Sequence, residues 1–327
     1  MTASGPVVGL RPYAPGDESA WDALVERSHN GTFLHTRAFL AHHGARFTDR
    51  SVVFVDHKGA VVGVLPAALD PAEPSRVTSH PGLTYGGVVH AGDLRGDAMI
   101  MALTQAAIHF RDLGHLTFRY KVVPDIYHRV RSADDTYALF RLAASRYRCD
   151  LSAAVDVTSP DTRRRDRRRN LEVAMAAGLR VETGSSWLAP FWEVLEDNLR
   201  LKFGTTPVHS LAEISQLAER FPEQISCHAV LDGNDRCLAG LVNFHTHTVV
   251  HCQYSAANEA GFKTKALDVG FADSIATTRA AGLRWYDFGT CNEQEGQVLN
   301  SGLYDFKLSF GAGSLAHEFY DLELTST

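Results

Sequence analysis

The sequence predicts a mixed α/β protein built from two similar domains, each with helices on the faces of a mixed sheet, and a cleft between them. The chain has 327 residues, more than one typical core accommodates. A hairpin pattern occurs once in each half, and each is followed by an extended segment, a helix that stops at glycine and a further strand. Similar domains commonly bind a ligand where they meet, so we expect a cleft there.

In the first half, two extended runs flank a polar turn at 56–59, and a later helical run stops at Gly114. Glycine just past a helical run is a stop signal because it adopts the left-handed conformation at little cost. The elements predicted in this half are strands at 51–55 and 60–65, a helix at 98–113 and a strand at 116–120.

The second half repeats this order around a turn at 232–235, and its helical run stops at Gly282. Ser210 and Glu213 form a capping-box pattern at the start of one of its helices. The predicted elements are helices at 187–201 and 211–221, strands at 225–231 and 237–244, a helix at 265–281 and a strand at 283–288. With a strand at 147–157 as the join, the predicted domains are 1–155 and 156–313, followed by a tail at 314–327 that can return to the first domain.

Composition and charge narrow the class of protein. The chain is 45% apolar and 21% charged, which is typical of globular proteins, and no apolar run approaches the ~20 residues that span a bilayer. The first ten residues lack the pattern of a signal peptide. Five scattered cysteines without a C-x-x-C pair favour a reducing, cytoplasmic setting. From the lack of a long apolar run we expect no membrane partner. A net charge of −6 means that nucleic-acid binding would require a local basic patch.

Three sequence blocks carry a family resemblance. The first is D-F-G at 287–289 with G-L-Y at 302–304, F-K at 306–307 and F-G at 310–311. The second is S-H-P-G-L-T-Y-G-G at 79–87, and the third is R-N-L at 169–171 followed by Ala174 and Gly178. Together with the order of elements, they resemble the GCN5-related N-acetyltransferase (GNAT) fold in tandem, specifically its Fem-type branch of FemABX peptidyl transferases. The resemblance implies amide-bond formation from an activated acyl donor, which is aminoacyl-tRNA in Fem-type enzymes and acyl-CoA in ordinary GNAT enzymes.

Two departures from the family pattern bear on the donor. The long coiled-coil arm of many cell-wall Fem enzymes has no counterpart, because no heptad run is present. The GNAT pyrophosphate loop, Q/R-x-x-G-x-G/A, corresponds to 258–263, where Gly261 is kept and Lys263 replaces the second glycine. This change favours aminoacyl-tRNA over coenzyme A. If acyl-CoA is nevertheless the donor, Gly261, Lys263 and Lys265 at a helix start are expected to hold its phosphates.

Lys307 is the candidate for stabilising the oxyanion that forms when an amine attacks the donor carbonyl, or for binding a phosphate or carboxylate beside it. It follows Phe306, which we expect to contact substrate, and its stem can pack on apolar surface while the ammonium seeks an anion. Asp287 is expected to receive the attacking ammonium or to orient Lys307. For Lys307 the alternative is a purely structural lysine, and for Asp287 it is a plain structural ion pair.

Tyr85, Gly86 and Gly87 are the candidate acceptor-binding residues in the first domain, because glycine lets a ligand approach the backbone closely. The alternative is a tight turn.

A run of six arginines and one aspartate at 163–169 is the candidate phosphate-binding segment. We expect Thr162 to cap a helix there, and the apolar stripe of that helix places Arg164, Arg167 and Arg168 towards the protein. Like charges at this density repel without a partner, which favours contact with tRNA phosphates. A solvated basic face is the alternative.

His245, His247 and His251 share the same parity and are expected on one face of a strand. A zinc site is disfavoured because no cysteine or carboxylate on that strand completes a ligand set. We select His247 as the candidate proton acceptor, with packed or exposed strand histidines as the alternative. Cys291, near Asp287, is expected to be an unactivated thiol.

These observations predict a cytoplasmic N-acyltransferase that transfers an aminoacyl group from aminoacyl-tRNA to the amine of a small-molecule or peptide acceptor. The donor ester supplies the driving force, so no cofactor or metal is expected. Two alternatives remain: an acyl-CoA-dependent N-acyltransferase, and a non-catalytic protein that binds tRNA or another ligand on the same scaffold.

Overall fold

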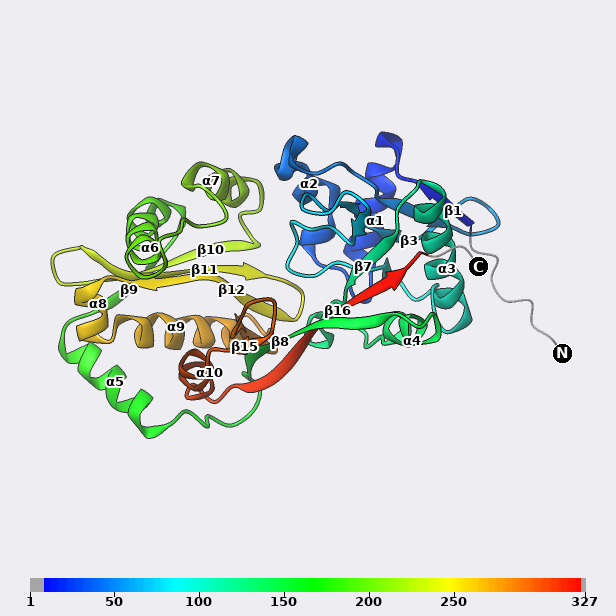
Figure 1. Ribbon diagram of the computed structural model, residues 1–327. Coiled ribbons are helices and arrows are strands. Elements are labelled where there is room, and N and C mark those ends of the chain that lie inside the picture. Colours follow the sequence, from blue (N-terminus) through cyan, green and yellow to red (C-terminus); the bar gives the residue numbers. More distant parts are fainter. Residues whose placement is uncertain (1–8, 325–327) are drawn as a thin grey trace. The chain divides into compact units, whose positions relative to one another are not determined.

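The computed structural model describes residues 9–324, and the chain divides into two compact units (Figure 1). The described part of the first unit comprises 9–150, 294–298 and 316–324. The second comprises Leu151–Glu293 and Leu299–Leu315. Among residues 9–324, no helix is both long and apolar enough to cross a membrane.

The first unit contains two groups of paired strands. Its elements are β1 (Gly9–Pro12), α1 (Glu18–Arg27), α2 (Arg37–Leu40), β2 (Val52–Val55), β3 (Val61–Leu65), β4 (Ala68–Leu69), β5 (Arg76–Thr78), β6 (Val89–His90), α3 (Asp97–Asp112), β7 (Thr117–Lys121) and α4 (Asp134–Arg141). One sheet has the order β1-β2-β3-β6, which confirms the hairpin predicted at 51–65. In the other, β7 pairs in parallel with β5 and antiparallel with the end of β16 (Gly313–Glu323).

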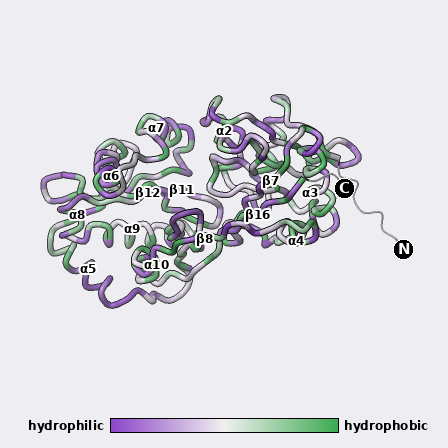
Figure 2. The backbone as a smooth tube through the Cα atoms, in the orientation of Figure 1, coloured by the Kyte–Doolittle hydropathy of each residue, from purple (hydrophilic) through white to green (hydrophobic). Residues whose placement is uncertain are grey.

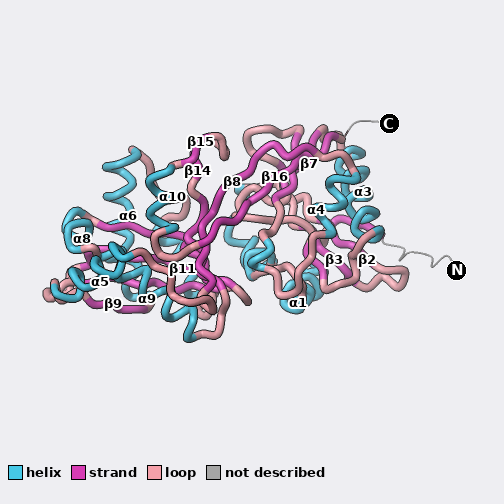
Figure 3. Tube along the Cα trace, turned by 90° about the horizontal axis from the view of Figure 1, so that it is seen from below, coloured by secondary structure: helices cyan, strands magenta, loops and turns pink. Residues whose placement is uncertain are grey.

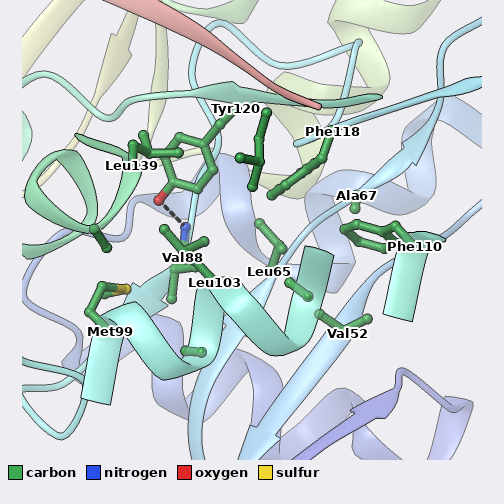
Figure 4. Close-up of a cluster of buried hydrophobic side chains, with 14 of the residues drawn as sticks. Val52, Leu65, Ala67, Val88, Met99, Leu103, Phe110, Phe118, Tyr120 and Leu139 are labelled. Carbon is green, nitrogen blue, oxygen red and sulfur yellow. Dashed lines mark hydrogen bonds between the residues drawn. The ribbon is translucent and has the colours of Figure 1, made fainter. Parts of the chain in front are cut away.

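The core of the first unit lies between α3 and these strands (Figure 4). Tyr120 of β7 is fully buried, and its hydroxyl accepts a 2.7 Å hydrogen bond from the Val88 amide and donates one of 2.8 Å to Asp135. Burying a tyrosine in an apolar core is favourable only when its hydroxyl finds partners. Leu322 of β16 is buried in the same core, so the end of the chain completes this unit.

The second unit is built around one sheet. Its elements are β8 (Ser145–Asp156), α5 (Arg165–Ala176), β9 (Arg180–Thr183), α6 (Leu188–Phe203), α7 (Leu211–Arg220), β10 (Ile225–Leu231), β11 (Cys237–His245), β12 (Val249–Ala257), α8 (Glu259–Thr264), α9 (Ala266–Ala280), β13 (Trp285–Thr290), β14 (Asn292–Glu293), β15 (Val298–Leu299) and α10 (Ser301–Leu308). The strand order is β8-β13-β12-β11-β10-β9. Neighbouring strands are antiparallel except β12 and β13.

Helices cover both faces of this sheet. α6 and α7 lie on one side of β10–β12 and α9 lies on the other, which we call the α6 face and the α9 face (Figure 1). α5 packs against α9, as the view from the α9 side shows (Figure 3). Tyr286 and Phe288 of β13 contact Phe271 of α9. Because side chains alternate along a strand, Asp287 between them points to the α6 face.

The local predictions for both units are largely confirmed. β10 and β11 form the predicted hairpin, and Ser210 and Glu213 form the predicted capping box. Gly114 and Gly282 follow α3 and α9 with φ of 86° and 72°, as their role as helix stops requires. The predicted cap at Thr162 is wrong, because α5 begins at Arg165 with Arg164 as the N-cap residue.

The predicted single strand of three histidines is also wrong. His245 is the last residue of β11, His247 lies in the exposed turn that follows, and His251 belongs to β12. The parity of 245, 247 and 251 therefore does not place them on one face.

Replacing Leu322 by Ala tests whether β16 stabilises the first unit. We expect Leu322→Ala to lower the free energy of unfolding of this unit by about 2–5 kcal/mol, because it removes buried methyl groups and leaves a cavity. Denaturant unfolding monitored by circular dichroism measures the loss. Glu323→Ala, the exposed neighbour, is the matched control, and equal effects of the two substitutions would contradict the assignment.

Candidate active site

The structure brings Asp287 and His251 together on neighbouring parallel strands. The two residues are direct register partners, and His251 Nδ1 lies 3.0 Å from Asp287 Oδ2. The aspartate side chain is fully buried and the histidine side chain is 12% exposed. An ionised carboxylate can only accept, so the proton of this hydrogen bond resides on Nδ1. His251 Nε2 then carries the lone pair that a proton acceptor needs.

Two further donors orient the Asp287 carboxylate. Its Oδ1 accepts hydrogen bonds from Ser152 Oγ of β8 at 2.7 Å and from the Gly289 amide at 2.9 Å. Gly289 has a φ of 76°, and a Cβ there would lie 3.4 Å from the His251 ring. Glycine therefore suits the left-handed backbone at this position, whereas a Cβ would make only an ordinary contact with the ring.

The site lies where two paired strands separate. Parallel pairing covers Val249–His251 and Trp285–Asp287 and ends there, although β12 continues to Ala257. The Asp287 carboxylate and the His251 ring are thus at the last paired position, on the α6 face. Further along β12 on this side, the Tyr254 hydroxyl lies 2.6 Å from Nδ1 of His209, and the Tyr254 ring packs edge-on against Trp192 of α6.

Lys307 joins this site from α10. Its side chain is buried, and the ammonium donates hydrogen bonds to the carbonyl oxygens of Gly289 at 2.9 Å and Thr290 at 2.8 Å. The ammonium also interacts with the Cys291 thiol, so its neighbours are two carbonyl oxygens and one sulfur. Asp287 and Lys307, which the sequence predicts to be neighbours, both lie at the end of β13. Asp287 is a residue of this strand, and Lys307 binds the carbonyl oxygens of its last two residues.

The cysteines of this region are poor nucleophiles. Burial raises the pKa of Cys291, an effect that the charge of Lys307 opposes. Burial also raises the pKa of Cys252 to about 11. At neutral pH both thiols are protonated, in agreement with the expectation of an unactivated Cys291.

The remaining predicted catalytic residue, His247, lies in the β11–β12 turn and not in the strand pairing that holds Asp287. Phe306 of α10 is half-buried and contacts Phe271 and Phe310, so its ring contributes to the core on the α9 face. Its expected contact with substrate stays a prediction.

Tyr85, Gly86 and Gly87 lie inside the first unit. The Tyr85 side chain is buried, and its hydroxyl donates to Thr32 Oγ1 at 3.3 Å. A Cβ at Gly86 would lie 2.0 Å from the Ser79 carbonyl oxygen, and one at Gly87 would lie 2.6 Å from the Tyr120 hydroxyl. Packing within the protein thus explains both glycines, and the acceptor-binding role of this segment stays a prediction.

Half of the predicted basic segment is already paired. Its ion pairs are Arg163 with Asp161, Arg164 with Asp305, and Arg167 with Asp268. The sequence analysis places Arg164, Arg167 and Arg168 towards the protein, and for Arg164 and Arg168 this is wrong. Arg164 is half-exposed in its ion pair, and Arg168 is exposed.

Arg167 is held most firmly, because its guanidinium also lies over the rings of Phe306 and Phe310. Arg165, Arg168 and Arg169 are exposed, and no acidic side chain of the described residues forms an ion pair with them. They form the hydrophilic start of α5 (Figure 2).

The residues after β12 do not fit a pyrophosphate group. The Gly261 amide donates to Asn258 Oδ1 at 2.9 Å, and a Cβ at Gly261 would lie 2.3 Å from the Leu238 carbonyl oxygen. This glycine therefore serves capping and packing. Lys263 forms an ion pair with Glu259 at 2.6 Å, and exposed Lys265 is the left-handed residue before α9.

The first turn of α9 also carries a negative charge. The buried Asp268 carboxylate accepts hydrogen bonds from Arg167 and Asn170. The start of a helix favours anions, and here the first turn carries a carboxylate of the protein that is paired with Arg167. Within 9–324, no group of three or more histidine, cysteine, aspartate or glutamate side chains is arranged to bind a metal ion.

Comparisons with known proteins agree with this architecture. Residues 160–307 match the family model described as acetyltransferase (GNAT) domain. The crystal structure of FemX superposes with a TM-score of 0.68 at 13% identity, covering 96% of this chain and 97% of FemX. L-PGS from Bacillus licheniformis gives 0.60 at 11% identity, covering 92% and 90%. A tandem GNAT protein from the clavulanic acid biosynthesis pathway gives 0.54 at 11% identity, covering 98% and 100%. No curated protein sequence matches the chain.

The predicted mixed α/β class and the Fem-type tandem GNAT resemblance are therefore confirmed. Residues 160–307 form an acyltransferase domain of the GNAT type, which also confirms the predicted class of enzyme. The site of His251, Asp287 and Lys307 lies in this domain.

The predicted proton acceptor was thus the wrong member of the histidine group to meet Asp287, and nothing in the sequence around Ser152 predicts its contact with that carboxylate. The signal that identifies His251 is its register opposite Asp287 on a parallel neighbour, which becomes visible only once both strands are placed.

Substitutions at the two histidines test this site. His251→Asn keeps a donor towards Asp287 but has no basic nitrogen, so we expect kcat for acyl transfer to fall by about 10²–10⁴-fold. His247→Asn in the turn is the matched substitution and is expected to leave kcat within about twofold of the unaltered protein. Steady-state kinetics measure both. A lower kcat in His247→Asn with a normal kcat in His251→Asn would favour His247 as the proton acceptor.

Proposed function

We propose that this protein is an N-acyltransferase that transfers an aminoacyl group from aminoacyl-tRNA to the amine of a small-molecule or peptide acceptor. The observation that carries the proposal is the His251–Asp287 pair at the point where β12 and β13 separate within the GNAT domain. Aminolysis of an ester requires a neutral amine, and a histidine fixed by a buried carboxylate is suited to make one.

In the proposed reaction, the acceptor amine gives a proton to His251 Nε2, and its nitrogen attacks the ester carbonyl of the donor. Asp287 keeps the imidazole oriented and stabilises the imidazolium that forms, because its carboxylate lies 3.0 Å from Nδ1. The tetrahedral intermediate collapses to the amide, and the leaving ribose hydroxyl takes up the proton from His251. The ester bond supplies the driving force.

The role proposed for Lys307 is to hold positive charge near the oxyanion. Its two bonds to the Gly289 and Thr290 carbonyls fix the ammonium in place before the reaction begins. Donors that are fixed in advance stabilise developing charge without reorganisation, and the loss of one typically costs about 2.7–4 kcal/mol of barrier.

An aminoacyl-tRNA donor is supported by two features. The segment 258–268 is occupied by its own capping, ion-pair and packing contacts, and its buried Asp268 is paired with Arg167. The exposed arginines of α5 offer separate phosphate contacts. FemX and L-PGS, whose folds resemble this chain, are consistent with such a transferase.

A donor assay tests the proposed function directly. Purified protein is incubated with a panel of amines and either mixed aminoacyl-tRNA or acetyl-CoA, with and without ribonuclease. We expect amide products from aminoacyl-tRNA, and ribonuclease should abolish them. Ribonuclease-insensitive products from acetyl-CoA would overturn the choice of donor, and no product with any donor would overturn the catalytic proposal.

Replacing Lys307 by Met separates its two roles. We expect a lower free energy of unfolding, by about 1–3 kcal/mol, because two buried carbonyl groups lose their donor. We also expect kcat per folded molecule to fall by about 10²–10³-fold, as for the loss of an oxyanion donor. Denaturant unfolding and active-site-normalised kinetics measure the two effects. Lower stability with unchanged kcat would show that Lys307 is only structural.

Salt dependence tests the α5 contacts. If Arg165, Arg168 and Arg169 each contact one phosphate, the plot of log affinity for tRNA against log salt should have a slope of about −2 to −3. Each Arg→Gln substitution among the three is expected to reduce the magnitude of that slope by slightly less than one. Arg236→Gln, an exposed arginine that pairs with Asp232, is the control. A slope that the three substitutions leave unchanged would contradict the assignment.

A further inference from the structure

A second hydrogen-bonded group lies on the α9 face of the same sheet. Asp273 of α9 has Oδ2 2.9 Å from His228 Nδ1 of β10, and His228 Nε2 lies 3.2 Å from Ser226 Oγ. On the other side of the same hydroxyl, His245 Nε2 of β11 lies 2.8 Å from Ser226 Oγ. Four polar side chains from three elements therefore form one chain of hydrogen bonds.

With both histidines neutral, one arrangement of protons satisfies every group in this chain. The Asp273 carboxylate can only accept, so His228 carries its proton on Nδ1 and presents a lone pair at Nε2. Ser226 has one hydroxyl proton and donates it to that lone pair. His245 must then donate its own Nε2 proton to Ser226 Oγ. Burial lowers the pKa of His245 to about 4, so its ring is a neutral donor at pH 7.

We propose that Ser226, His228 and Asp273 form a second catalytic centre, in which Ser226 is an acyl-accepting nucleophile for small activated carboxylic esters. A serine that donates to a histidine whose other nitrogen is held by an aspartate is the arrangement that activates serine in hydrolases, and it is recognised by geometry, not by sequence position. His245 Nε2 lies 2.8 Å from the same hydroxyl and holds its oxygen in place beside His228.

The proposed reaction balances without a cofactor. Ser226 Oγ attacks the ester carbonyl while its proton passes to His228 Nε2, and the tetrahedral intermediate expels the alcohol, which takes up that proton. The products are the acyl-serine and the free alcohol. A water molecule then gives a proton to His228 and attacks the acyl-serine, which releases the carboxylic acid and restores the serine.

The surroundings of Ser226 permit a small substrate to reach it. Pairing of β10 with β9 begins at His228, so Ser226 lies beyond the end of the neighbouring strand. Ser226 and His245 are half-buried, and the Asp273 side chain is 33% exposed. His228 is almost fully buried, which keeps the histidine in one orientation. Asp287 and His251 point to the α6 face, so the two centres are separated by the sheet.

A fluorophosphonate probe tests this centre, since it forms a stable adduct only with activated serines. We expect the folded protein to be labelled, peptide mapping by mass spectrometry to place the adduct on Ser226, and p-nitrophenyl acetate to be hydrolysed. Ser226→Ala should abolish the adduct. Asp273→Asn keeps the nucleophile and the base but not the carboxylate, and should slow labelling by about 10- to 10⁴-fold. Ser186→Ala, at an exposed serine, is the matched control and should label like the unaltered protein.

Peptide mapping on the unaltered protein keeps the test independent of whether a variant folds. Folded protein that shows no adduct on Ser226 would overturn the proposal. Labelling at an unchanged rate in Asp273→Asn would also overturn it, because a serine that reacts without its carboxylate is not activated by this chain of hydrogen bonds. The donor assay for aminoacyl transfer has a separate readout, so the failure of one proposal is distinguishable from the failure of the other.

Discussion

The buried Asp287 carboxylate is the constraint on which the site depends. A charge removed from water is tolerated only when hydrogen bonds replace its hydration. Here the donors come from Ser152 on β8, His251 on β12 and the Gly289 backbone of β13. Satisfying one carboxylate thus fixes three adjacent strands relative to one another and sets the histidine ring in a single orientation. The same backbone segment supplies the carbonyl oxygens that bind Lys307. The geometry of the candidate site and the strand pairing are therefore maintained by the same hydrogen bonds.

Local sequence signals were sufficient to predict much of the fold but only part of this site. Hairpin turns, the capping box at Ser210 and the glycine stops depend on neighbouring residues, so they are legible in the sequence. Asp287 and Lys307 were found through their family motif. The sequence does not identify His251 as the proton acceptor because the turn at 246–248 is not recognisable. It consists of threonine and histidine and contains no glycine, proline or asparagine. Without that turn, parity assigned three histidines to one strand.

The basic segment shows why a charge run is a weak guide to which residues contact a ligand. Asp268 and Asp305 lie about a hundred or more residues along the chain from their arginine partners, and nothing in the local sequence reveals these pairs. Arg167 is at once ion-paired and stacked on two phenylalanine rings, a combination suited to the planar, weakly hydrated guanidinium. Its charge therefore helps to attach α5 to α9 and α10. An external anion can therefore contact only the exposed arginines in the first turns of α5. Such a local basic patch can bind phosphate even though the net charge of the chain is −6.

The two histidine–carboxylate pairs of the second unit differ in where they hold a serine, and this difference leads to different chemistry. Ser152 donates to the carboxylate of the first pair, on the side away from the histidine nitrogen that would accept a proton. Ser226 lies at the Nε2 side of the second pair. In the proposed aminoacyl transfer, the first pair serves a nucleophile brought by the substrate, the acceptor amine. A base with its own hydroxyl suits a covalent acyl intermediate on the protein. One sheet can hold both because alternation sends neighbouring side chains to opposite faces, where each carboxylate controls only its own histidine.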